Sequence, residues 1–509
     1  MPCKTLSQCF AQSFAARRDK TAIRFLRHGR IETDITYGDL DRDANRAAHA
    51  FLDMGVCKGD RVILHLEKSL VLVTAFLGLQ KIGAVAVPLN PGFKAAEMAY
   101  LAGDAEAALI VLGPDQKPVV DEIDPDCRTL LVDPGRPYRE IDFFRSSPDW
   151  APDADIGPED PGLIIYTSGT TGAPKGAVLT QENLVHDAGN IIRIWEITEA
   201  DVLCHALPLF HVHGLCFALN TALMAGSSVA MLDVFDPEKV TGALVGDTGG
   251  KACSVFMAVP SMYAKLLAYA EGKGYDFDHI RLWTSGSAPL LPRDFERIKR
   301  VFGKEPVERE GMSETGMNFS NPIHGARKPG SIGLPLPGLE ARIVDPASGA
   351  DKTPGETGEI RLKGPGISPG YWRKPEETAD AFEAGWFRTG DLGNVDEDGY
   401  YYLTDRIKHI IISGGENISP KEVEAVINGF DHVAESCVVG IPDDRWGEKV
   451  VAAVVAGPGH GIEAQDVKDR CKKQLHDWKC PKEIRFVDEL PKNAMGKVLT
   501  DEVKTLFES

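Results

Sequence analysis

The sequence has few cysteines and no excess of basic residues, and each shortage excludes a class of protein. Its 10 cysteines among 509 residues include no C-x-x-C pair, which argues against a disulfide-built scaffold and favours reduced, mostly buried thiols in a cytoplasmic protein. Its 56 Lys and Arg are outnumbered by 75 Asp and Glu, and the net charge of −19 argues against general nucleic-acid binding. This acidic balance still allows a local basic pocket for a phosphate-bearing ligand.

The sequence also lacks a secretory signal. Residues 1–18 carry basic residues and no acid, as transit peptides do, but they contain no long apolar run. An amphipathic helix with Leu6, Phe10 and Phe14 on one face explains the same residues. Residues 214–232 are uncharged and nearly long enough to span a bilayer, but their Gly, Asn, Thr and Ser favour a buried helix followed by a strand. We therefore expect no stable membrane insertion.

The composition that is present is that of a globular protein, with 43% hydrophobic and 26% charged residues. At roughly 150 residues per domain, the length predicts two to four domains. Short apolar runs at 60–66, 83–88 and 108–112 predict strands, and residues 69–81 predict a helix. This alternation predicts an α/β fold with largely parallel sheets covered by helices.

The pattern changes after residue 330, where Gly and Pro crowd together and short strands such as 359–363 appear between them. This texture predicts a small antiparallel β-barrel or sheet. Beyond residues 405–408, about 100 residues with their own alternation of strands and helices predict a separate α+β domain. We therefore expect an N-terminal domain at 1–405, a hinge at 406–408 and a small C-terminal domain at 409–509.

The most informative motif is Y-T-S-G-T-T-G-A-P-K-G at residues 166–176. Its glycines allow tight turns, and its hydroxyls, backbone amides and lysine can bind phosphate oxygens. The motif lacks the spacing of a Walker A loop, and a Ser/Thr-rich hairpin turn is the alternative. The candidate phosphate-binding residues are Thr167, Ser168, Gly169, Thr170, Thr171, Gly172 and Lys175.

This motif resembles the phosphate-loop signature of the adenylate-forming superfamily, which includes acyl-CoA synthetases, peptide-synthetase adenylation domains and firefly luciferase. The resemblance covers nearly the whole chain, because further motifs follow in the family's order. It implies a large N-terminal domain, a mobile C-terminal domain and a two-step reaction that uses ATP, Mg²⁺, a carboxylic acid and coenzyme A. The acid first attacks ATP to give acyl-adenylate and pyrophosphate, and the CoA thiol then displaces AMP.

Two further motifs, at residues 311–316 and S-G-S-A-P at residues 285–289, resemble the family's nucleotide site. G-M-S-E-T-G at residues 311–316 resembles the second ATP motif, in which Glu314 would hold Mg²⁺ together with Thr170. From the residues alone, a solvated loop carboxylate is the alternative for Glu314. Glu310 departs from the family, which usually has an adenine-stacking aromatic residue there. The resemblance also assigns to ATP the residues Gly286, Ser287, Ala288, Glu310, Gly311, Met312 and Ser313.

The last part of the chain carries the remaining nucleotide motifs. Asp391, in W-F-R-T-G-D, would accept hydrogen bonds from the ribose hydroxyls, and Arg406 would reach the ribose and the α-phosphate. Lys408 falls at the family's hinge position. The surrounding stretch departs from the commoner Gly-Arg-x-Lys-Asp pattern at Asp405 and His409. Surface solvation is the alternative for each of these charges.

Two loops resemble the elements that serve the separate half-reactions. S-G-G-E-N at residues 413–417 resembles the loop that lies beside CoA, and a hairpin turn is the alternative. P-K-N-A-M-G-K at residues 491–497 resembles the motif in which a catalytic lysine, here Lys497, serves adenylation. The candidate CoA-binding residues are Ser413, Gly414, Gly415 and Glu416.

The segment P-L-F-H-V-H-G at residues 208–214 is a candidate for the acid site. By resemblance, His211 lies beside the channel for the acyl group and the thiol, where it would act in catalysis and substrate binding. With Cys204, His205 and Cys216 nearby, a zinc site is the alternative, but the spacing of these residues is not that of a metal site.

Segments 210–214, 281–290 and 317–322 resemble malonyl-CoA synthetases more than other ligases. That resemblance implies that Arg281 grips the far carboxylate of malonate or methylmalonate. A surface salt bridge is the alternative for Arg281. A medium-chain or aromatic acid, a carrier protein in place of CoA, and an ATP-binding protein without catalysis are alternatives for function. We expect a monomer or homodimer whose acid-binding residues are His211, Arg281, Ser285 and Met317.

Overall fold

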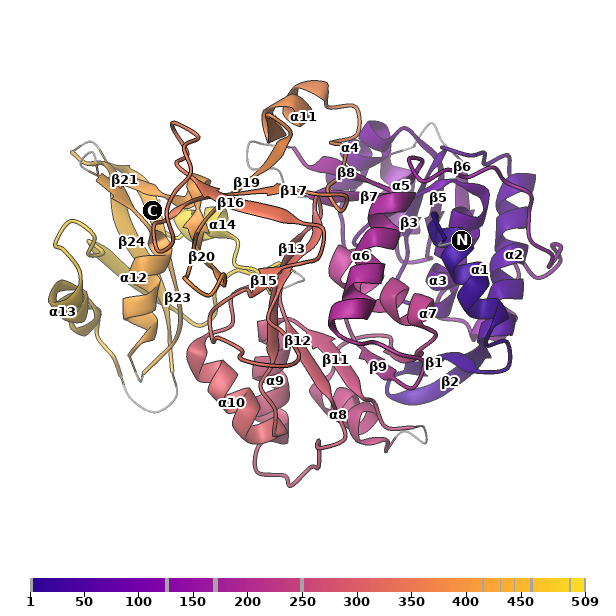
Figure 1. The fold of residues 1–509 in the computed structure, drawn as a ribbon, viewed down its shortest axis with the longest axis horizontal. Helices are drawn as coiled ribbons and strands as arrows, with labels where there is room; N and C mark the ends of the chain where they lie inside the picture. The colour runs from indigo at the N-terminus through magenta and orange to yellow at the C-terminus, as the bar shows by residue number, and fades with distance from the viewer. Residues whose placement is uncertain are drawn as a thin grey trace. The chain divides into compact units, whose positions relative to one another are not determined.

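The computed structural model describes residues 3–123, 128–167, 173–247, 251–413, 416–430, 432–443, 445–457, 461–493 and 496–507, with the side chains of Lys408 and Asn417 excepted. The chain forms two compact units (Figure 1). The first comprises residues 1–340 and 363–387, and the second comprises residues 341–362 and 388–509. The hinge expected at 406–408 lies within the second unit, so this division differs from the expected one, and the hinge stays a prediction.

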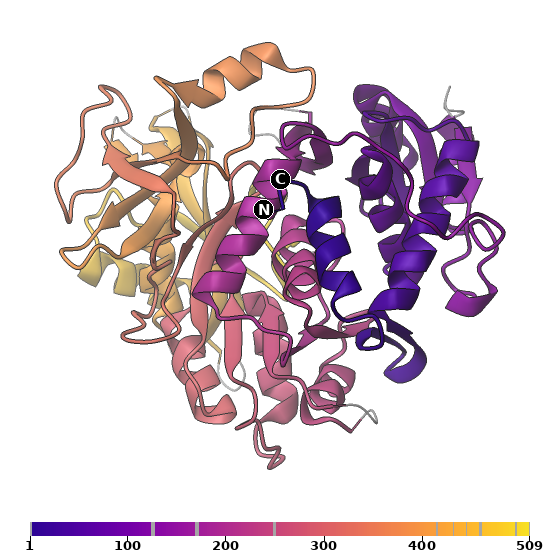
Figure 2. The same cartoon turned by 45° about the vertical axis from the view of Figure 1, so that its right-hand side comes forward.

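The chain begins with helix α1 (Leu6–Ala15), capped by Thr5, whose hydroxyl accepts a hydrogen bond from the Gln8 amide. Its buried face includes Leu6, Phe10 and Phe14, which confirms the predicted amphipathic helix. Helix α2 (Tyr37–Asp53) follows and packs against α1; both are indigo in Figures 1 and 2.

The expectation of reduced thiols is wrong for one pair of cysteines. Cys3 and Cys9 form a disulfide with their Cα atoms 5.3 Å apart. Cys3 precedes the cap of α1, so the chain before the helix can fold back against the helix and bring Cys3 close to Cys9. The other described cysteines are free; Cys57 is exposed, and the rest are buried.

The larger sheet of the first unit combines a parallel centre with antiparallel edges. Strands β1, β10, β9, β11, β12 and β13 are parallel neighbours in that order, whereas β2, β14 and β15 pair antiparallel. In spatial order its described strands are β15 (Leu334–Pro335), β14 (Gly316–Ser320), β13 (Val307–Met312), β12 (Leu282–Ser285), β11 (Val255–Ala258), β9 (Val202–His205), β10 (Ser228–Leu232), β1 (Thr21–Arg27) and β2 (Arg30–Thr36).

The second sheet of this unit is parallel except at one edge, where β7 and β8 form an antiparallel hairpin. Strands β3, β4 and β5 occupy the segments where the sequence predicts strands, and they are buried on both faces as near-continuous apolar runs. In spatial order its described strands are β6 (Arg128–Leu131), β5 (Ala107–Leu112), β3 (Arg61–His65), β4 (Val85–Pro88), β7 (Pro161–Thr167) and β8 (Lys175–Thr180).

Helices cover these sheets, as the predicted α/β fold requires. The predicted helix at 69–81 is α3 (Leu70–Ile82), which begins after the cap Ser69 and ends at Gly83 with φ of +68°. The predicted buried helix at 214–232 is a π-helix, η2 (His213–Asn220), continued by α7 (Thr221–Ala225) and then β10. The other helices of the unit are α4 (Ala95–Ala105), α5 (Lys117–Ile123), α6 (Gln181–Ile194), α8 (Pro237–Val245), α9 (Pro260–Ala270), α10 (Pro292–Phe302) and α11 (Pro375–Ala381).

The region predicted to be a small β-barrel contains a sheet with the order β16-β17-β19-β18, in which β20 also pairs with β19. Short apolar stretches between Gly-rich turns form these strands. Their bounds are β16 (Glu340–Val344), β17 (Gly358–Lys363), β18 (Phe382–Glu383), β19 (Trp386–Val395) and β20 (Tyr401–Arg406).

The C-terminal part of the second unit is α+β, as predicted, with strand β24 (Gly447–Ala456) at the centre of its sheet. Val450, Ala452 and Val454 pack on the side of helices α12 (Pro420–Asn428) and α13 (Ala464–Gln474). Val451 and Ala453 belong to the opposite cluster, with helix α14 (Thr500–Thr505). Burial on both faces explains the unbroken apolar run of β24. The remaining strands are β21 (Ile411–Ser413), β22 (Glu416–Ile418), β23 (Val433–Asp443) and β25 (Glu483–Val487).

Within the described residues, no helix combines the length and apolarity that crossing a membrane requires.

Candidate active site

The predicted phosphate-binding motif lies on the hairpin between β7 and β8. Thr167 and Lys175 are opposite each other in the antiparallel register and form the last pair of the two strands before the turn. The Lys175 ammonium lies 5.4 Å from the centre of the Tyr371 ring. The predicted residues Ser168, Gly169, Thr170, Thr171 and Gly172 lie outside the described residues.

Glu314 lies in the tight turn between β13 and β14, and its carboxylate meets the phosphate hairpin. Glu314 is 9% exposed, and its Oε1 accepts hydrogen bonds from Tyr371 OH at 3.1 Å and Thr167 Oγ1 at 3.4 Å. Two motifs separated by 147 residues therefore meet. A carboxylate among hydroxyl groups suits Mg²⁺, which proteins hold through one or two carboxylates and the phosphates of a substrate.

Tyr371 was missed by the sequence reasoning, although it follows the Gly/Pro-rich run that marked this region. Its segment joins β8 to the Glu314 turn: Ser368 N donates to Glu314 O at 2.7 Å, and Trp372 N donates to Gly176 O at 2.8 Å. Burial, followed by the nearby Glu314 carboxylate, raises the pKa of Tyr371, so its hydroxyl stays protonated and donates. The signal that could have found it is the G-Y-W triplet at the end of that run.

The predicted acid site contains two histidines that burial keeps neutral. His211 is half-buried, and burial lowers its pKa to about 4. His213 is 2% exposed; its Nδ1 lies 3.2 Å from Ser287 Oγ, and its Nε2 has no hydrogen-bond partner among the described residues. Ser285 is also buried, and its hydroxyl likewise lacks a described partner. These groups can therefore offer hydrogen bonds to a ligand.

Arg309 is the residue of this region that sequence reasoning missed entirely. It lies on β13, is 3% exposed, and none of its three guanidinium nitrogens has a hydrogen-bond partner within the described structure. Burial lowers the pKa of Arg309 to about 10, which still leaves it charged at neutral pH. The guanidinium lies 5.0 Å from the Phe217 ring centre. A Cβ atom at Gly286 would come within 2.6 Å of it, so only glycine lets the two segments pass.

Arg281 forms an ion pair in the structure, which favours the salt bridge that is the alternative to its predicted function. Its Nε and one terminal nitrogen donate to the two carboxylate oxygens of Asp201, both at 2.7 Å, and further bonds go to the carbonyls of Trp195 and Glu196. Arg281 precedes β12, whereas residues 286–288, which the resemblance assigns to ATP, follow it, so Arg281 lies at the amino edge of the parallel sheet. Ligands of such sheets bind at the carboxyl edge.

Met317 and Glu310 lie on the β13–β14 hairpin. The Met317 amide donates to Asp187 Oδ1 at 2.8 Å, and burial raises the pKa of Asp187 to about 7. Glu310 accepts a hydrogen bond from Asn318 Nδ2 at 3.0 Å. Along a strand, side chains alternate between faces, so Glu310 and Arg309 project to opposite sides. Among the other predicted ATP residues, Gly286 is buried, Ser287 exposed, and Ala288, Gly311, Met312 and Ser313 half-buried.

In the second unit, the predicted ribose-binding residues are direct neighbours. Asp391 on β19 and Arg406 on β20 are paired in register and form an ion pair of 2.7 Å. The family departure Asp405 has a local function, because it accepts hydrogen bonds from Ser419 Oγ and Lys421 N at the start of α12. The backbone of Lys408 lies in a 3₁₀ turn between residues 407 and 409.

The two loops assigned to the half-reactions are described only in part. Ser413 and Glu416 face each other across the β21–β22 hairpin, and Gly414 and Gly415 lie outside the described residues. Lys497 is exposed at the end of a turn in which its amide donates to Asn493 Oδ1 at 3.0 Å.

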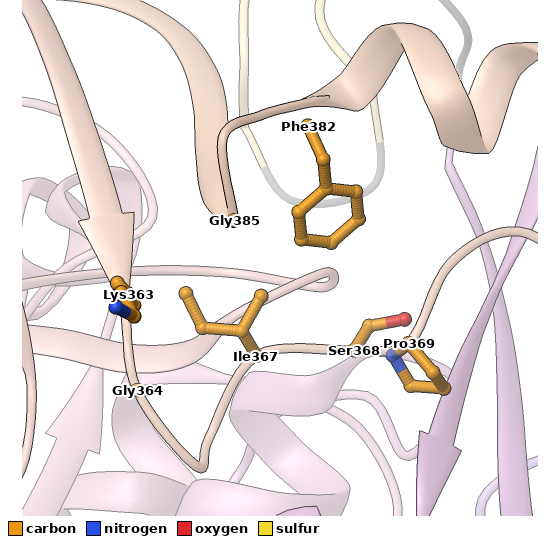
Figure 3. A pocket seen from close by; sticks show the side chains of 7 residues that line it. All are labelled: Lys363, Gly364, Ile367, Ser368, Pro369, Phe382 and Gly385. Carbon is orange, nitrogen blue, oxygen red and sulfur yellow. The ribbon is translucent and has the colours of Figure 1, made fainter.

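Two other features carry no predicted site residue. No group of three or more His, Cys, Asp or Glu suited to a metal ion occurs among the residues that the structure describes, so it gives no support for the zinc alternative. An open depression of about 310 Å³ lies beside the Tyr371 segment, where Phe382 and Ile367 face each other (Figure 3). Its lining residues are Lys363, Gly364, Ile367, Ser368, Pro369, Phe382 and Gly385.

Comparison with known proteins identifies the family. Residues 10–372 match the model of the AMP-binding enzymes, and residues 422–497 match that of the AMP-binding enzyme C-terminal domain. The chain is 34% identical to feruloyl-CoA synthase of Amycolatopsis over 95% of both chains. It is also 34% identical to the mitochondrial malonate–CoA ligase ACSF3 of Bos taurus, over 95% of this chain and 90% of that protein. ATP-bound MatB of Rhodopseudomonas palustris superposes with a TM-score of 0.91 at 37% identity, covering 99% of both chains.

The chain therefore belongs to the family of AMP-binding enzymes, and the predicted α/β fold is confirmed. It is an AMP-forming acid–CoA ligase, which uses ATP and CoA as substrates.

Proposed function

We propose that this ligase activates a small dicarboxylic acid, with malonate or methylmalonate as the best candidate. The observation that carries the proposal is the buried Arg309, whose guanidinium lacks a hydrogen-bond partner in the described structure. A buried cation is costly unless an anion pairs with it, and a guanidinium pairs with a carboxylate through two parallel hydrogen bonds. The carboxylates of Glu310 and Asp187 act on Arg309 electrostatically but form no described hydrogen bond with it, so the second carboxylate of a diacid would supply the hydrogen-bonded anion.

The neighbours of Arg309 favour a short diacid. Phe217 packs against the guanidinium, and the backbone of Gly286 passes close to it, so these groups limit the space around the charge. His213 contributes Nε2, a second buried polar atom without a described partner. One carboxylate of the diacid would be bound between Arg309 and His213, and the other carboxylate would be free to react.

The reaction proceeds in two steps. The free carboxylate attacks the α-phosphorus of ATP, and pyrophosphate leaves. The sulfur of the CoA thiol then attacks the acyl carbon and loses its proton, and AMP leaves with the electrons of the broken C–O bond. Lys175 and the hydroxyls of the 167–172 segment would bind the phosphates, and Lys497 would stabilise charge on the α-phosphate during the first step. Asp391 and Arg406 would bind the ribose.

The remaining predicted residues complete the proposed chemistry. Glu314 and Thr170 would hold Mg²⁺, which when bound neutralises the charge of the phosphate oxygens. His211, neutral because burial lowers its pKa, would line the channel where the thioester forms. Ser413 to Glu416 would lie beside the CoA arm. Lys408 would be the hinge at which the C-terminal domain moves between the two half-reactions. A cytoplasmic monomer or homodimer remains the expected state.

The test is a panel of acids assayed by ATP-dependent pyrophosphate release and by acyl-CoA formation. Malonate and methylmalonate should exceed acetate, butyrate, benzoate and ferulate. Arg309→Met should lose roughly 10²- to 10³-fold in kcat/KM for the diacid, as expected for a buried charge pair, and retain monoacid activity. Arg281→Met is the matched control. The Arg281 guanidinium is held by Asp201, so its removal should not affect acid preference.

A preference for an uncharged acyl chain, together with an Arg309→Met variant that behaves like the wild type, would reject the diacid and favour a medium-chain or aromatic acid. The name of the Amycolatopsis relative makes ferulate a necessary member of the panel. If the enzyme transferred the acyl group to a carrier protein faster than to CoA, the carrier protein would be the acceptor in place of CoA.

A further inference from the structure

A polar cluster outside the residues assigned above lies at the C-terminal end of α4. Asp104 is its centre: Oδ2 accepts a hydrogen bond from Tyr166 OH at 2.8 Å, and Oδ1 pairs with Lys374 Nζ at 2.8 Å. The Asp104 side chain is 9% exposed, so its charge is largely removed from water. One turn earlier on the same helix, Tyr100 donates its hydroxyl hydrogen to Pro174 O at 2.8 Å.

Within the motif, Tyr166 and Pro174 flank its hydroxyl-rich part, residues 167–173. Residues at positions i and i+4 of a helix lie on the same face, so Tyr100 and Asp104 present two adjacent polar groups to the hairpin. Tyr100 OH also lies 3.4 Å from Asp104 Oδ1, but it has a single hydrogen, and the shorter distance is to Pro174. Helix α4 therefore contacts both flanks of the motif through separate hydrogen bonds.

The cluster is built to keep these hydrogen bonds formed. Burial, and then the Asp104 carboxylate, raises the pKa of Tyr166, so its hydroxyl keeps its hydrogen and donates at neutral pH. The Lys374 ammonium balances the buried carboxylate. Lys374 belongs to the same segment as Trp372, whose amide donates to Gly176 O at 2.8 Å. The segment that supplies the cation is thus itself bound to the second strand of the hairpin.

We propose that Tyr100 and Asp104 are positioning residues that hold the two flanks of the phosphate loop at a fixed separation for adenylation. The proposal rests on the proposed phosphate-binding function of residues 167–175. A loop that binds phosphates through backbone amides and hydroxyls loses affinity when its ends can separate, because the donors must then be ordered again on binding. Tyr100 and Tyr166 are only half-buried, which argues against a function limited to filling the core.

The test compares Tyr100→Phe, Tyr166→Phe and the double variant with the wild type, using malonate or the best acid of the panel. Each single variant should raise the KM for ATP roughly 3- to 10-fold in pyrophosphate release, the value expected for one hydrogen bond. Thioester formation from supplied acyl-adenylate and CoA should be unchanged. If both tyrosines act on the same loop, the double variant should not equal the product of the single effects.

The matched control is Tyr138→Phe. Tyr138 donates to Asp43 Oδ2 at 2.8 Å, and Asp43 pairs with Arg145 at 3.0 Å, so the same kind of tyrosine–carboxylate–cation cluster exists away from the phosphate hairpin. This variant should lower the melting temperature and leave the KM for ATP unchanged.

An unchanged KM for ATP in both tyrosine variants, or an equal loss in both half-reactions, would overturn the proposal. A KM effect in Tyr138→Phe as large as in Tyr166→Phe would likewise assign the effect to stability. These results are distinct from a failure of the proposed substrate, which is decided by the acid preference of the wild type. Lys175→Met tests the underlying function of the loop, because it should raise the KM for ATP whether or not α4 positions the loop.

Discussion

Tyr371 donates its hydroxyl hydrogen to Glu314 Oε1 at 3.1 Å, which joins two motifs separated by 57 residues. The same carboxylate oxygen accepts from Thr167 at 3.4 Å, so Glu314 is oriented from two sides. This relationship predicts how the enzyme responds to loss of one of those donors.

Tyr371→Phe should weaken the response to Mg²⁺ without preventing folding. Removing a hydrogen bond to a metal-binding carboxylate typically costs roughly 10-fold or more in metal affinity. We expect the Mg²⁺ concentration for half-maximal pyrophosphate release to rise by about that factor. Tyr402→Phe is the control, because Tyr402 OH also donates to a carboxylate, Asp396 Oδ2, at 3.0 Å. An identical Mg²⁺ titration in the Tyr371 variant and the wild type would separate Tyr371 from the metal site.

Arg281→Met should reduce stability and leave acid preference unchanged. The Asp201 side chain is 6% exposed and the Arg281 side chain 34%, so removal leaves a buried carboxylate without its main cation. We expect a loss of about 1–3 kcal/mol in the free energy of unfolding, reduced from the fully buried value because Arg281 is partly screened by water. Chemical denaturation measures this loss, and the acid panel checks the preference.

The Arg281 effect should also depend on pH. Burial acts to raise the pKa of Asp201, but hydrogen bonds from Arg281, Thr198 and Ser254 outweigh it, and the pKa is lowered from 3.8. A lowered carboxyl pKa gives stability that is present above 3.8 and lost as the pH falls through the folded-state value. The difference between wild type and variant should therefore shrink in acid. A difference that grows on acidification would contradict the ion pair.

Lys497→Ala should block adenylation and spare the second half-reaction. The side chain is placed on an exposed turn, and its proposed function is to stabilise negative charge that develops only when the acid attacks ATP. Loss of such a group costs roughly 10²- to 10³-fold in rate. Pyrophosphate release measures the first step, and thioester formation from supplied acyl-adenylate measures the second. An equal loss in both steps would show that the function of Lys497 is not limited to adenylation.

Sequence reasoning succeeded where local pattern determines structure. The apolar runs that became β3, β4 and β5 are unbroken because each strand is buried on both faces. The Ser69 and Gly83 signals at the ends of α3 depend only on local backbone chemistry. The family and the order of its motifs were likewise available from the sequence.

The two arginines show what sequence reasoning could not supply. Arg281 and Arg309 both lie at or near strands of one sheet, and nothing in their neighbouring residues distinguishes them. Their difference is the partner: Asp201, 80 residues away in sequence, neutralises Arg281, whereas Arg309 has no described hydrogen-bond partner. Charge pairing over such distances depends on the tertiary fold. The disulfide between Cys3 and Cys9 was missed because sequence spacing does not report where the chain turns.

Glu308→Gln should stabilise the protein at neutral and alkaline pH. Glu308 is 7% exposed, its Oε1 accepts a hydrogen bond from Gly330 N at 2.9 Å, and burial raises its pKa from 4.5 to about 7. Glutamine retains an acceptor for Gly330 and carries no charge. It therefore keeps the hydrogen bond and avoids burying a carboxylate.

The sign of the pH dependence follows from the raised pKa. Between pH 4.5 and about 7 the folded protein holds a proton on Glu308 that the unfolded chain releases, so the stability of the wild type falls as the pH rises through this range. The glutamine of the variant does not titrate. The difference in melting temperature between the Glu308→Gln variant and the wild type should therefore be near zero at pH 4.5 and increase as the pH rises to about 8. At the upper end, the variant should gain on the order of 2 kcal/mol in the free energy of unfolding. The exposed Glu122→Gln variant should show no such rise. A constant difference across the pH range would mean that Glu308 is charged in the folded protein throughout.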